Sequence, residues 1–208
     1  MGELIVTEFT TLDGVAQAPG GPEEDPEGGF AYGGWQAPLF DDEAGGLIFD
    51  QAKGMDALLL GRRTYDIFAA YWPKAPAEMD FTRLLNRIPK FVATRTLEGP
   101  LDWEGASVLE GELAEGVAGL KERYGRVHVI GSLGLVQSLL AQGLVDRMNL
   151  WMYPLVLGRG KRVFEGGAVP SALRLTTSRA FPNGSLQLEY AWAGEPAVGD
   201  MTELDGNA

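Results

Sequence analysis

The chain has 208 residues, 45% of them hydrophobic, and a formal net charge of −12 at pH 7. Such a composition is typical of one globular domain, and so acidic a surface disfavours non-specific contact with nucleic acid phosphates or anionic lipid. The absence of cysteine excludes disulfides, a thiolate nucleophile and Cys-ligated zinc. Without a leader-like start or a run of roughly 18 apolar residues, we expect a cytoplasmic protein with neither a membrane nor a nucleic acid partner.

Apolar runs and periodic segments predict alternating strands and helices along the chain. A first strand at 3–9 is followed by a long segment, 10–40, that is rich in Gly, Pro and acidic residues. The later strands are expected at 55–61, 90–96, 107–111, 127–131 and 146–158, and the helices at 42–53, 62–72, 77–88, 112–125 and 132–144. Short, wholly apolar strands between helices are typical of a buried parallel sheet.

The C-terminal part changes character. Segments 172–181 and 185–193 alternate with period two and flank Pro-Asn-Gly, which predicts an antiparallel hairpin. The fold class is therefore α/β, a mixed and mostly parallel sheet with an antiparallel edge. We expect one domain over 1–193 and a flexible acidic tail over 194–208.

The long segment 10–40 contains four aromatic residues, Phe30, Tyr32, Trp35 and Phe40. Loops of this length inside a compact domain are usually functional or disordered, and the aromatics indicate that at least the second half packs onto the domain. We expect a partly mobile loop over an active site. A surface excursion without a role is the alternative.

Three predicted strands end in residues suited to phosphate binding. The strand ends carry Gly61, Arg62, Arg63 and Thr64, then Thr94 and Arg95, then Gly131, Ser132, Leu133 and Gly134. Glycine lets a phosphate approach the free N–H groups of a helix N-terminus, and arginines at such a position oppose the helix dipole unless an anion lies nearby. Together they predict a phosphate pocket. The alternatives are glycines needed only for turning and arginines paired with surface carboxylates.

Taken in order, these segments resemble a known family. LLLGRRTYD, VATRT, VIGSLGLVQSLL and PLVLGRGKRVF, preceded by FTTLDGVAQ, resemble the dihydrofolate reductase superfamily, and more closely the riboflavin-biosynthesis reductase branch, RibD C-terminal domain-like. The resemblance implies a three-layer α/β/α fold and an NADPH-dependent oxidoreductase similar to 5-amino-6-(5-phosphoribosylamino)uracil reductase. Its substrate would be a small planar nitrogen heterocycle, of pterin or aminopyrimidine type, in riboflavin or folate-like metabolism, reduced by hydride transfer.

The resemblance also implies the cofactor site. The 2′-phosphate and pyrophosphate of NADPH would contact Gly61, Arg62, Arg63, Thr64, Thr94 and Arg95, with the pyrophosphate also held by Gly131, Ser132, Leu133 and Gly134. Family members commonly have consecutive glycines at this last turn, where this chain has Ser132 and Leu133.

For catalysis, the position of the helix carboxylate in dihydrofolate reductases falls on Gly45, although Asp42, Glu43 and Asp50 are close in sequence. Folate is therefore not the expected substrate. The family's S-x-D-G segment instead nominates Thr11 and Asp13 as catalytic residues, with Asp13 positioning a substrate amine or relaying a proton. An Asp-Gly turn is the alternative.

The S-x-D-G segment also places Gly14 beside the substrate, and an insertion could bring Asp42 there as well. Trp35 and Tyr32 could stack on a planar heterocycle, or equally anchor the loop. A homodimer is expected at the family level, and Arg159, Lys161 and Arg162 could contact a substrate phosphate or the partner subunit.

His128 is the one histidine of the chain and lies in an apolar strand, so we expect it in the core or at an interface, with a catalytic base as the alternative. With one histidine and no cysteine, no metal site is predicted and a zinc deaminase is excluded. Two further functions stay open: a reductase that uses a flavin or deazaflavin nucleotide, and a non-catalytic nucleotide-binding module.

Overall fold

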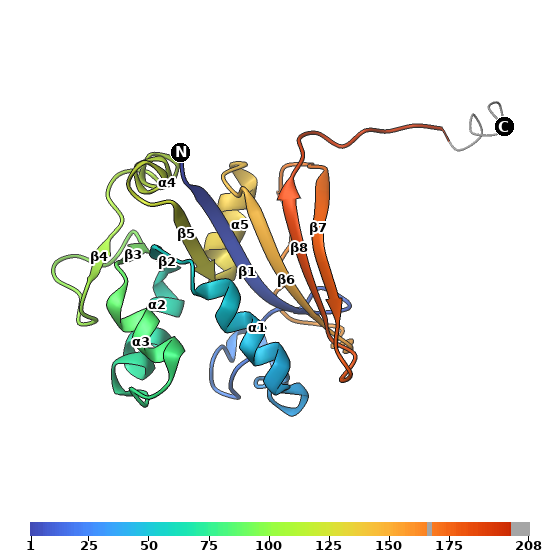
Figure 1. Ribbon diagram of the computed structural model, residues 1–208, viewed down its shortest axis with the longest axis horizontal. Coiled ribbons are helices and arrows are strands. Elements are labelled where there is room, and N and C mark those ends of the chain that lie inside the picture. The colour runs from blue at the N-terminus through green and yellow to red at the C-terminus, as the bar shows by residue number, and fades with distance from the viewer. Residues whose placement is uncertain (166–167, 201–208) are drawn as a thin grey trace.

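The computed structural model describes residues 1–165 and 168–200, and these form one eight-stranded sheet with the order β4-β3-β2-β5-β1-β6-β8-β7 (Figure 1). The strands are β1 (Glu3–Thr11), β2 (Ala57–Gly61), β3 (Lys90–Ala93), β4 (Ala106–Val108), β5 (Arg126–Ile130), β6 (Arg147–Tyr153), β7 (Leu173–Ala180) and β8 (Leu186–Trp192). The helices are α1 (Asp42–Ala52), α2 (Arg62–Tyr71), α3 (Asp80–Arg87), α4 (Leu113–Arg123) and α5 (Leu133–Ala141).

The sheet has the expected mixed topology. Strands β4, β3, β2, β5, β1 and β6 are parallel, whereas β8 pairs antiparallel with both β6 and β7. The strand predicted at 146–158 is shorter, because β6 ends at Tyr153 and the next residue, Pro154, has no N–H to donate to a ladder. The predicted fold class is otherwise confirmed.

Helices cover both faces of the parallel part of the sheet, so its strands are buried on both sides. In β2, Leu58 and Leu60 pack against α1, α2 and α3, whereas Leu59 packs in a second cluster with α4 and α5. This arrangement explains why the central strands are almost continuously apolar. A polar side chain on a central strand is therefore buried whichever face it points to.

The segment before α1 crosses the carboxyl ends of the strands and contains two short 3-10 helices, η1 (Glu27–Gly29) and η2 (Ala37–Leu39). Its aromatic residues are partly in the core, as expected: Phe30 and Trp35 are buried, and the Trp35 indole donates a hydrogen bond to the Gln17 carbonyl at 2.8 Å. The Trp35 ring also meets the ring of Tyr153 edge to face, with centroids 5.5 Å apart. The loop is thereby attached to β6.

His128 lies in the core, as the sequence predicts, and is only 2% exposed. Its Nε2 has no hydrogen-bond partner among the described residues, and burial lowers the pKa of the imidazole to about 4. Among the residues that the structure describes, no helix is both long and apolar enough to cross a bilayer. Of the tail predicted over 194–208, residues 201–208 lie outside the described residues.

Candidate functional site

A cleft of about 850 Å³ opens at the carboxyl ends of β1, β2, β3 and β5. In parallel α/β sheets this edge is where ligands bind, since loops and helix N-termini converge there. One wall carries the predicted phosphate-binding residues Gly61, Arg62, Arg63, Thr64, Arg95, Gly131, Ser132, Leu133 and Gly134. The other wall comes from the loop 16–36 and from Lys161. The structure thus brings together three predicted strand ends.

The two glycine turns are directly connected. Gly61 and Ser132 are the N-cap residues of α2 and α5, and the Gly61 N–H donates a hydrogen bond to Ser132 Oγ at 2.9 Å. Gly131 and Ser132 both have left-handed backbone, with φ of 61° and 67°. For a serine this conformation costs about 1 kcal/mol or more, and such strain tends to occur at functional sites.

Neither α2 nor α5 has a side chain of the described residues capping its N-terminus. The backbone N–H groups of the first turns are therefore open to a ligand, and the helix dipoles favour an anion there. Gly134 adds to this opening, because a Cβ at that position would meet no atom within 4 Å.

The three cleft arginines differ in their partners. Arg62 Nε binds the Asp66 carboxylate of its own helix at 2.8 and 3.1 Å, and Arg63 forms an ion pair with Glu27. Arg95 makes no hydrogen bond or ion pair with the part of the chain that the structure describes, although it lines the cleft. The conflict of Arg62 and Arg63 with the α2 dipole is thus relieved by carboxylates, whereas Arg95 is free to meet a ligand anion.

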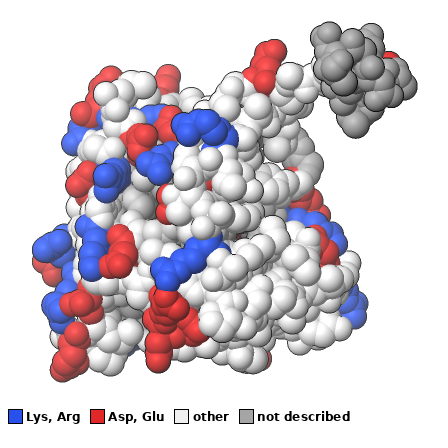
Figure 2. All heavy atoms as spheres, turned by 45° about the vertical axis from the view of Figure 1, so that its right-hand side comes forward, with Lys and Arg blue, Asp and Glu red and all other residues white. Residues whose placement is uncertain are grey.

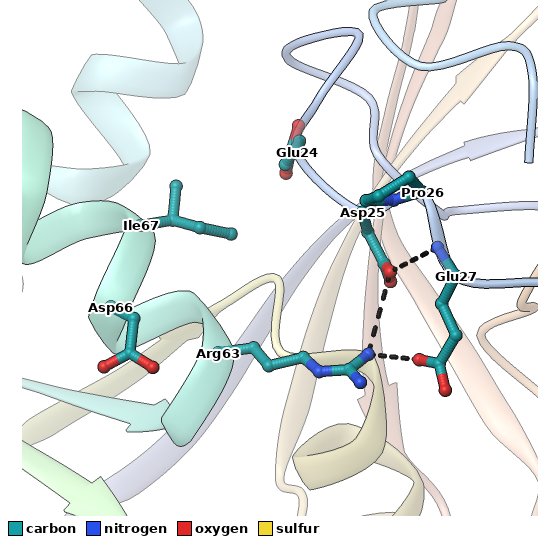
Figure 3. A pocket seen from close by; sticks show the side chains of 7 residues that line it. All are labelled: Glu24, Asp25, Pro26, Glu27, Arg63, Asp66 and Ile67. Atoms are coloured by element: carbon teal, nitrogen blue, oxygen red, sulfur yellow. Dashed lines mark hydrogen bonds and ion pairs between the residues drawn. The ribbon is translucent and has the colours of Figure 1, made fainter.

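Acidic residues of the loop bridge the mouth of the cleft (Figure 3). Arg63 extends from α2 toward Asp25 and Glu27, and the smaller hollow between them has a volume of about 420 Å³. Lys161 Nζ contacts the same two carboxylates, at 2.5 Å from Asp25 and 2.7 Å from Glu27. The Arg63 and Lys161 hydrogen bonds lower the pKa of Glu27 to about 2. Glu27 therefore stays ionised and competes with any ligand anion for Arg63.

Thr94 does not line the cleft, unlike its predicted companion Arg95. Its hydroxyl oxygen accepts hydrogen bonds from the backbone N–H groups of Thr96 and Leu97, at 3.1 and 3.2 Å. Thr94 therefore stabilises the turn after β3 and so supports Arg95 indirectly.

Thr11, Asp13 and Gly14 lie outside the set of residues that line the cleft. Asp13 Oδ1 accepts hydrogen bonds from the Thr11 hydroxyl at 2.6 Å and from the Leu157 N–H at 3.2 Å, while Oδ2 accepts from the Gly158 N–H at 2.8 Å. These hydrogen bonds, of which the one from Thr11 has the largest effect, lower the pKa of Asp13. Gly14 has φ of 82°, as the alternative of an Asp-Gly turn requires. The geometry thus gives Asp13 the role of tying the end of β1 to the loop after β6.

The other two residues predicted at the substrate are also placed elsewhere. Trp35 is buried and anchors the loop to which it belongs, in keeping with the anchoring alternative, and Asp42 is exposed in the first turn of α1. Gly45 follows on the same helix beside the ring of Phe40. None of the three is among the cleft-lining residues.

The cleft also contains a residue that sequence reasoning missed. Glu8 of β1 lines it and is 2% exposed, and Glu24 of the loop lies near enough to act on it electrostatically. In the sequence, Glu8 is a polar residue near the end of the first predicted strand, ELIVTEF, and nothing local marks it as buried. Its burial follows from the central position of β1 in the sheet.

The structural role of Asp13 is testable. We expect Asp13→Asn to lower the free energy of unfolding by about 2 kcal/mol, because an amide cannot accept all the charge-assisted hydrogen bonds of the carboxylate. Urea unfolding measures this, with Asp50→Asn as the control, since the Asp50–Lys53 pair is exposed and its loss should change little. A variant as stable as the native protein but unable to turn over substrate would instead favour a catalytic Asp13.

Comparison with known proteins agrees with this architecture. The sequence-family model of the RibD C-terminal domain matches residues 3–186 of this chain. The uncharacterized protein YyaP of Bacillus subtilis (strain 168) is 27% identical over 199 residues, which cover 92% of this chain and 95% of that protein.

Two solved structures have a similar fold. A putative riboflavin biosynthesis protein from Shewanella sp. PV-4 is 20% identical with a TM-score of 0.63, covering 92% of this chain and 99% of that one. The Thermotoga maritima diaminohydroxyphosphoribosylaminopyrimidine deaminase/5-amino-6-(5-phosphoribosylamino)uracil reductase is 16% identical with a TM-score of 0.61, covering 92% of this chain and 57% of that one. With a domain match over nearly its whole length, the chain belongs to the RibD C-terminal domain family.

Proposed function

We propose that this protein is an NADPH-dependent reductase of a small planar nitrogen heterocycle, of aminopyrimidine or pterin type. The observation that carries the proposal is the cleft in which two connected glycine turns, two uncapped helix N-termini and Arg95 face one space. Membership of the RibD C-terminal domain family supports an oxidoreductase, and the Thermotoga relative bears the name of an aminopyrimidine reductase.

The residues of the cleft fit a phosphorylated dinucleotide. The uncapped backbone N–H groups in the first turns of α2 and α5 would hold the pyrophosphate, and Arg62 and Arg95 would face the 2′-phosphate. When bound, NADPH would supply a hydride to the substrate. The chain's own part is to position both molecules and to exclude water, with the loop 16–36 as the wall that covers them.

NADPH binding is the first test. We expect NADPH to raise the thermal stability of the protein, by about 2.7 kcal/mol in free energy at one hundred times its Kd, and NADH to raise it less. Arg95→Ala should weaken NADPH binding about tenfold and leave NADH binding nearly unchanged, because only NADPH has the 2′-phosphate. Arg87→Ala is the control, since Arg87 is exposed on α3 and does not line the cleft.

Three results would contradict the proposal. These are no stabilisation by NADPH, equal effects of Arg95→Ala on both nucleotides, or a protein that purifies with the visible absorption of a bound flavin. A protein that binds NADPH but never reduces 5-amino-6-(5-phosphoribosylamino)uracil or a pterin would favour the non-catalytic module.

We also propose that the protein is a homodimer that uses the β7 edge of the sheet. All but the first residue of β7 are exposed, and Leu175 on this strand is 49% exposed. Figure 2 shows a broad area of uncharged residues on the face drawn, with charged side chains of both signs to its left and along its right edge. Exposed strand edges and apolar surface are typical of association sites. Light scattering at several concentrations measures the mass, and a monomer throughout would refute this part.

A further inference from the structure

Glu8 is a carboxyl group buried at the floor of the cleft. It lies in β1 between β5 and β6, is 2% exposed, and its Oε1 has no hydrogen-bond partner among the described residues. Burying a polar atom without a partner costs about 1–3 kcal/mol. Glu8 lines a ligand cleft, and a buried polar atom without a partner at such a place needs a specific explanation, of which a catalytic role is one.

No lysine or arginine of the described residues, those of the cleft included, lowers the pKa of Glu8. Its neighbour on β6 is Leu150, and α5, which covers this face of the sheet, has no titratable residue. The loop brings the Glu24 carboxylate, and the segment after β6 brings Glu165 and Lys161. Lys161 is already bound to Asp25 and Glu27. Desolvation, with a smaller contribution from Glu24, raises the pKa of Glu8 to about 8, so the group is a neutral acid at pH 7.

A neutral carboxylic acid can donate a proton, which an ionised carboxylate cannot do. Asp13 has a lowered pKa and accepts hydrogen bonds through both oxygens, so it has no proton to give near neutral pH. Glu27 is likewise ionised. A general acid works best when its pKa lies close to the working pH, a condition that Glu8 meets.

We propose that Glu8 is the proton donor of the reductase, and that the substrate presents to it the nitrogen of a C=N bond or the oxygen of a C=O bond. This inference rests on the proposed function. As the substrate carbon gains the hydride, the π pair moves to the nitrogen or oxygen, which takes the proton from the Glu8 carboxyl. The resulting carboxylate regains a proton from water, and the net change is addition of two hydrogens to the double bond.

The protonation state of Glu8 can be tested without any ligand. Infrared difference spectra between the native protein and Glu8→Gln should show the band of a protonated carboxylic acid at pH 7, and this band should disappear as the pH rises through about 8. Glu122→Gln, at an exposed position of α4, is the control and should not alter that band. A Glu8 that is ionised at pH 7 would overturn the inference.

Substrate contact can be tested with 6-aminouracil, a planar compound with carbonyl oxygens. Its affinity for the native protein should fall above about pH 8, as Glu8 loses its proton. Glu8→Gln should bind it with no such fall because the amide still donates a hydrogen bond, and Glu8→Ala should bind about tenfold more weakly. Equal affinity of all three proteins would overturn the contact.

Turnover separates this inference from the proposed function. With 5-amino-6-(5-phosphoribosylamino)uracil and NADPH, Glu8→Gln should lower kcat at least one-hundredfold and leave the Kd for NADPH unchanged. Full activity of Glu8→Gln would overturn the role of Glu8 and leave the reductase proposal intact. No NADPH binding by the native protein would instead refute the reductase, whereas the infrared result would still report the state of Glu8.

Discussion

Glu8→Gln is expected to be more stable than the native protein, by roughly 3 kcal/mol at pH 7. The reason is the difference in the pKa of Glu8, which is 4.5 in the unfolded chain and about 8 in the folded one. Between these values only the unfolded chain loses the proton, so ionisation favours unfolding as the pH rises. The stability that Glu8 contributes is complete below pH 4.5 and is lost by about pH 8.

Glutamine occupies a similar volume and does not ionise. The difference in free energy of unfolding between variant and native protein should therefore grow by about 1.4 kcal/mol per pH unit over this window. Urea unfolding at pH 4.5, 6 and 7.5 measures it, with Glu122→Gln as the exposed control. Two parallel curves would contradict a buried neutral Glu8. A variant that gains stability and loses turnover would show that the carboxyl is kept for function.

The second large effect is expected on the acid side, from His128→Leu. The His128 imidazole has a pKa of about 4 in the folded protein, against 6.5 in the unfolded chain, so below pH 6.5 the unfolded chain binds the extra proton. The native protein therefore loses stability as the pH falls from 6.5 to 4, by roughly 3 kcal/mol in total. The variant should not show this loss, and it also removes the unpartnered Nε2 from the core.

Acid unfolding followed by circular dichroism measures this prediction. The carboxylates with lowered pKa, such as Asp13 and Glu27, destabilise the native protein and the variant alike on acidification, so the difference between the two curves isolates His128. At pH 7.5 the imidazole is neutral in both states, and the comparison there measures packing alone. A difference that stays constant from pH 7.5 to 4 would show that His128 is not held neutral.

The order of elements could be predicted because burial on both faces leaves a plain record in the sequence. Segments such as ALLLG and RVHVI are too short for helices and too apolar for edge strands, and PNG marks the final hairpin. The predicted end of β6 was wrong. Leu155 and Val156 extend the apolar pattern beyond Pro154, although the backbone pairing of β6 stops at Tyr153. Periodicity reports which side chains are apolar and says little about where backbone pairing ends.

The candidate site was predictable in the part that depends on local turns. Gly61, Arg95 and Gly131 lie at strand ends, and parallel strands bring their ends to one edge whatever their separation along the chain. The partners of those residues were not predictable. Glu27 and Lys161 are 134 residues apart, and nothing in either segment announces that they pair. Glu8 was missed because its burial depends on the place of β1 in the sheet.

The walls of the cleft come from distant parts of the chain, from Glu8 near one end to Lys161 and Glu165. No short fragment contains this surface, so affinity for the proposed nucleotide would report that the domain has assembled. A bound nucleotide should accordingly slow amide hydrogen exchange throughout the parallel sheet, and a proteolytic cut in the loop 16–36 should release it even while both pieces remain together.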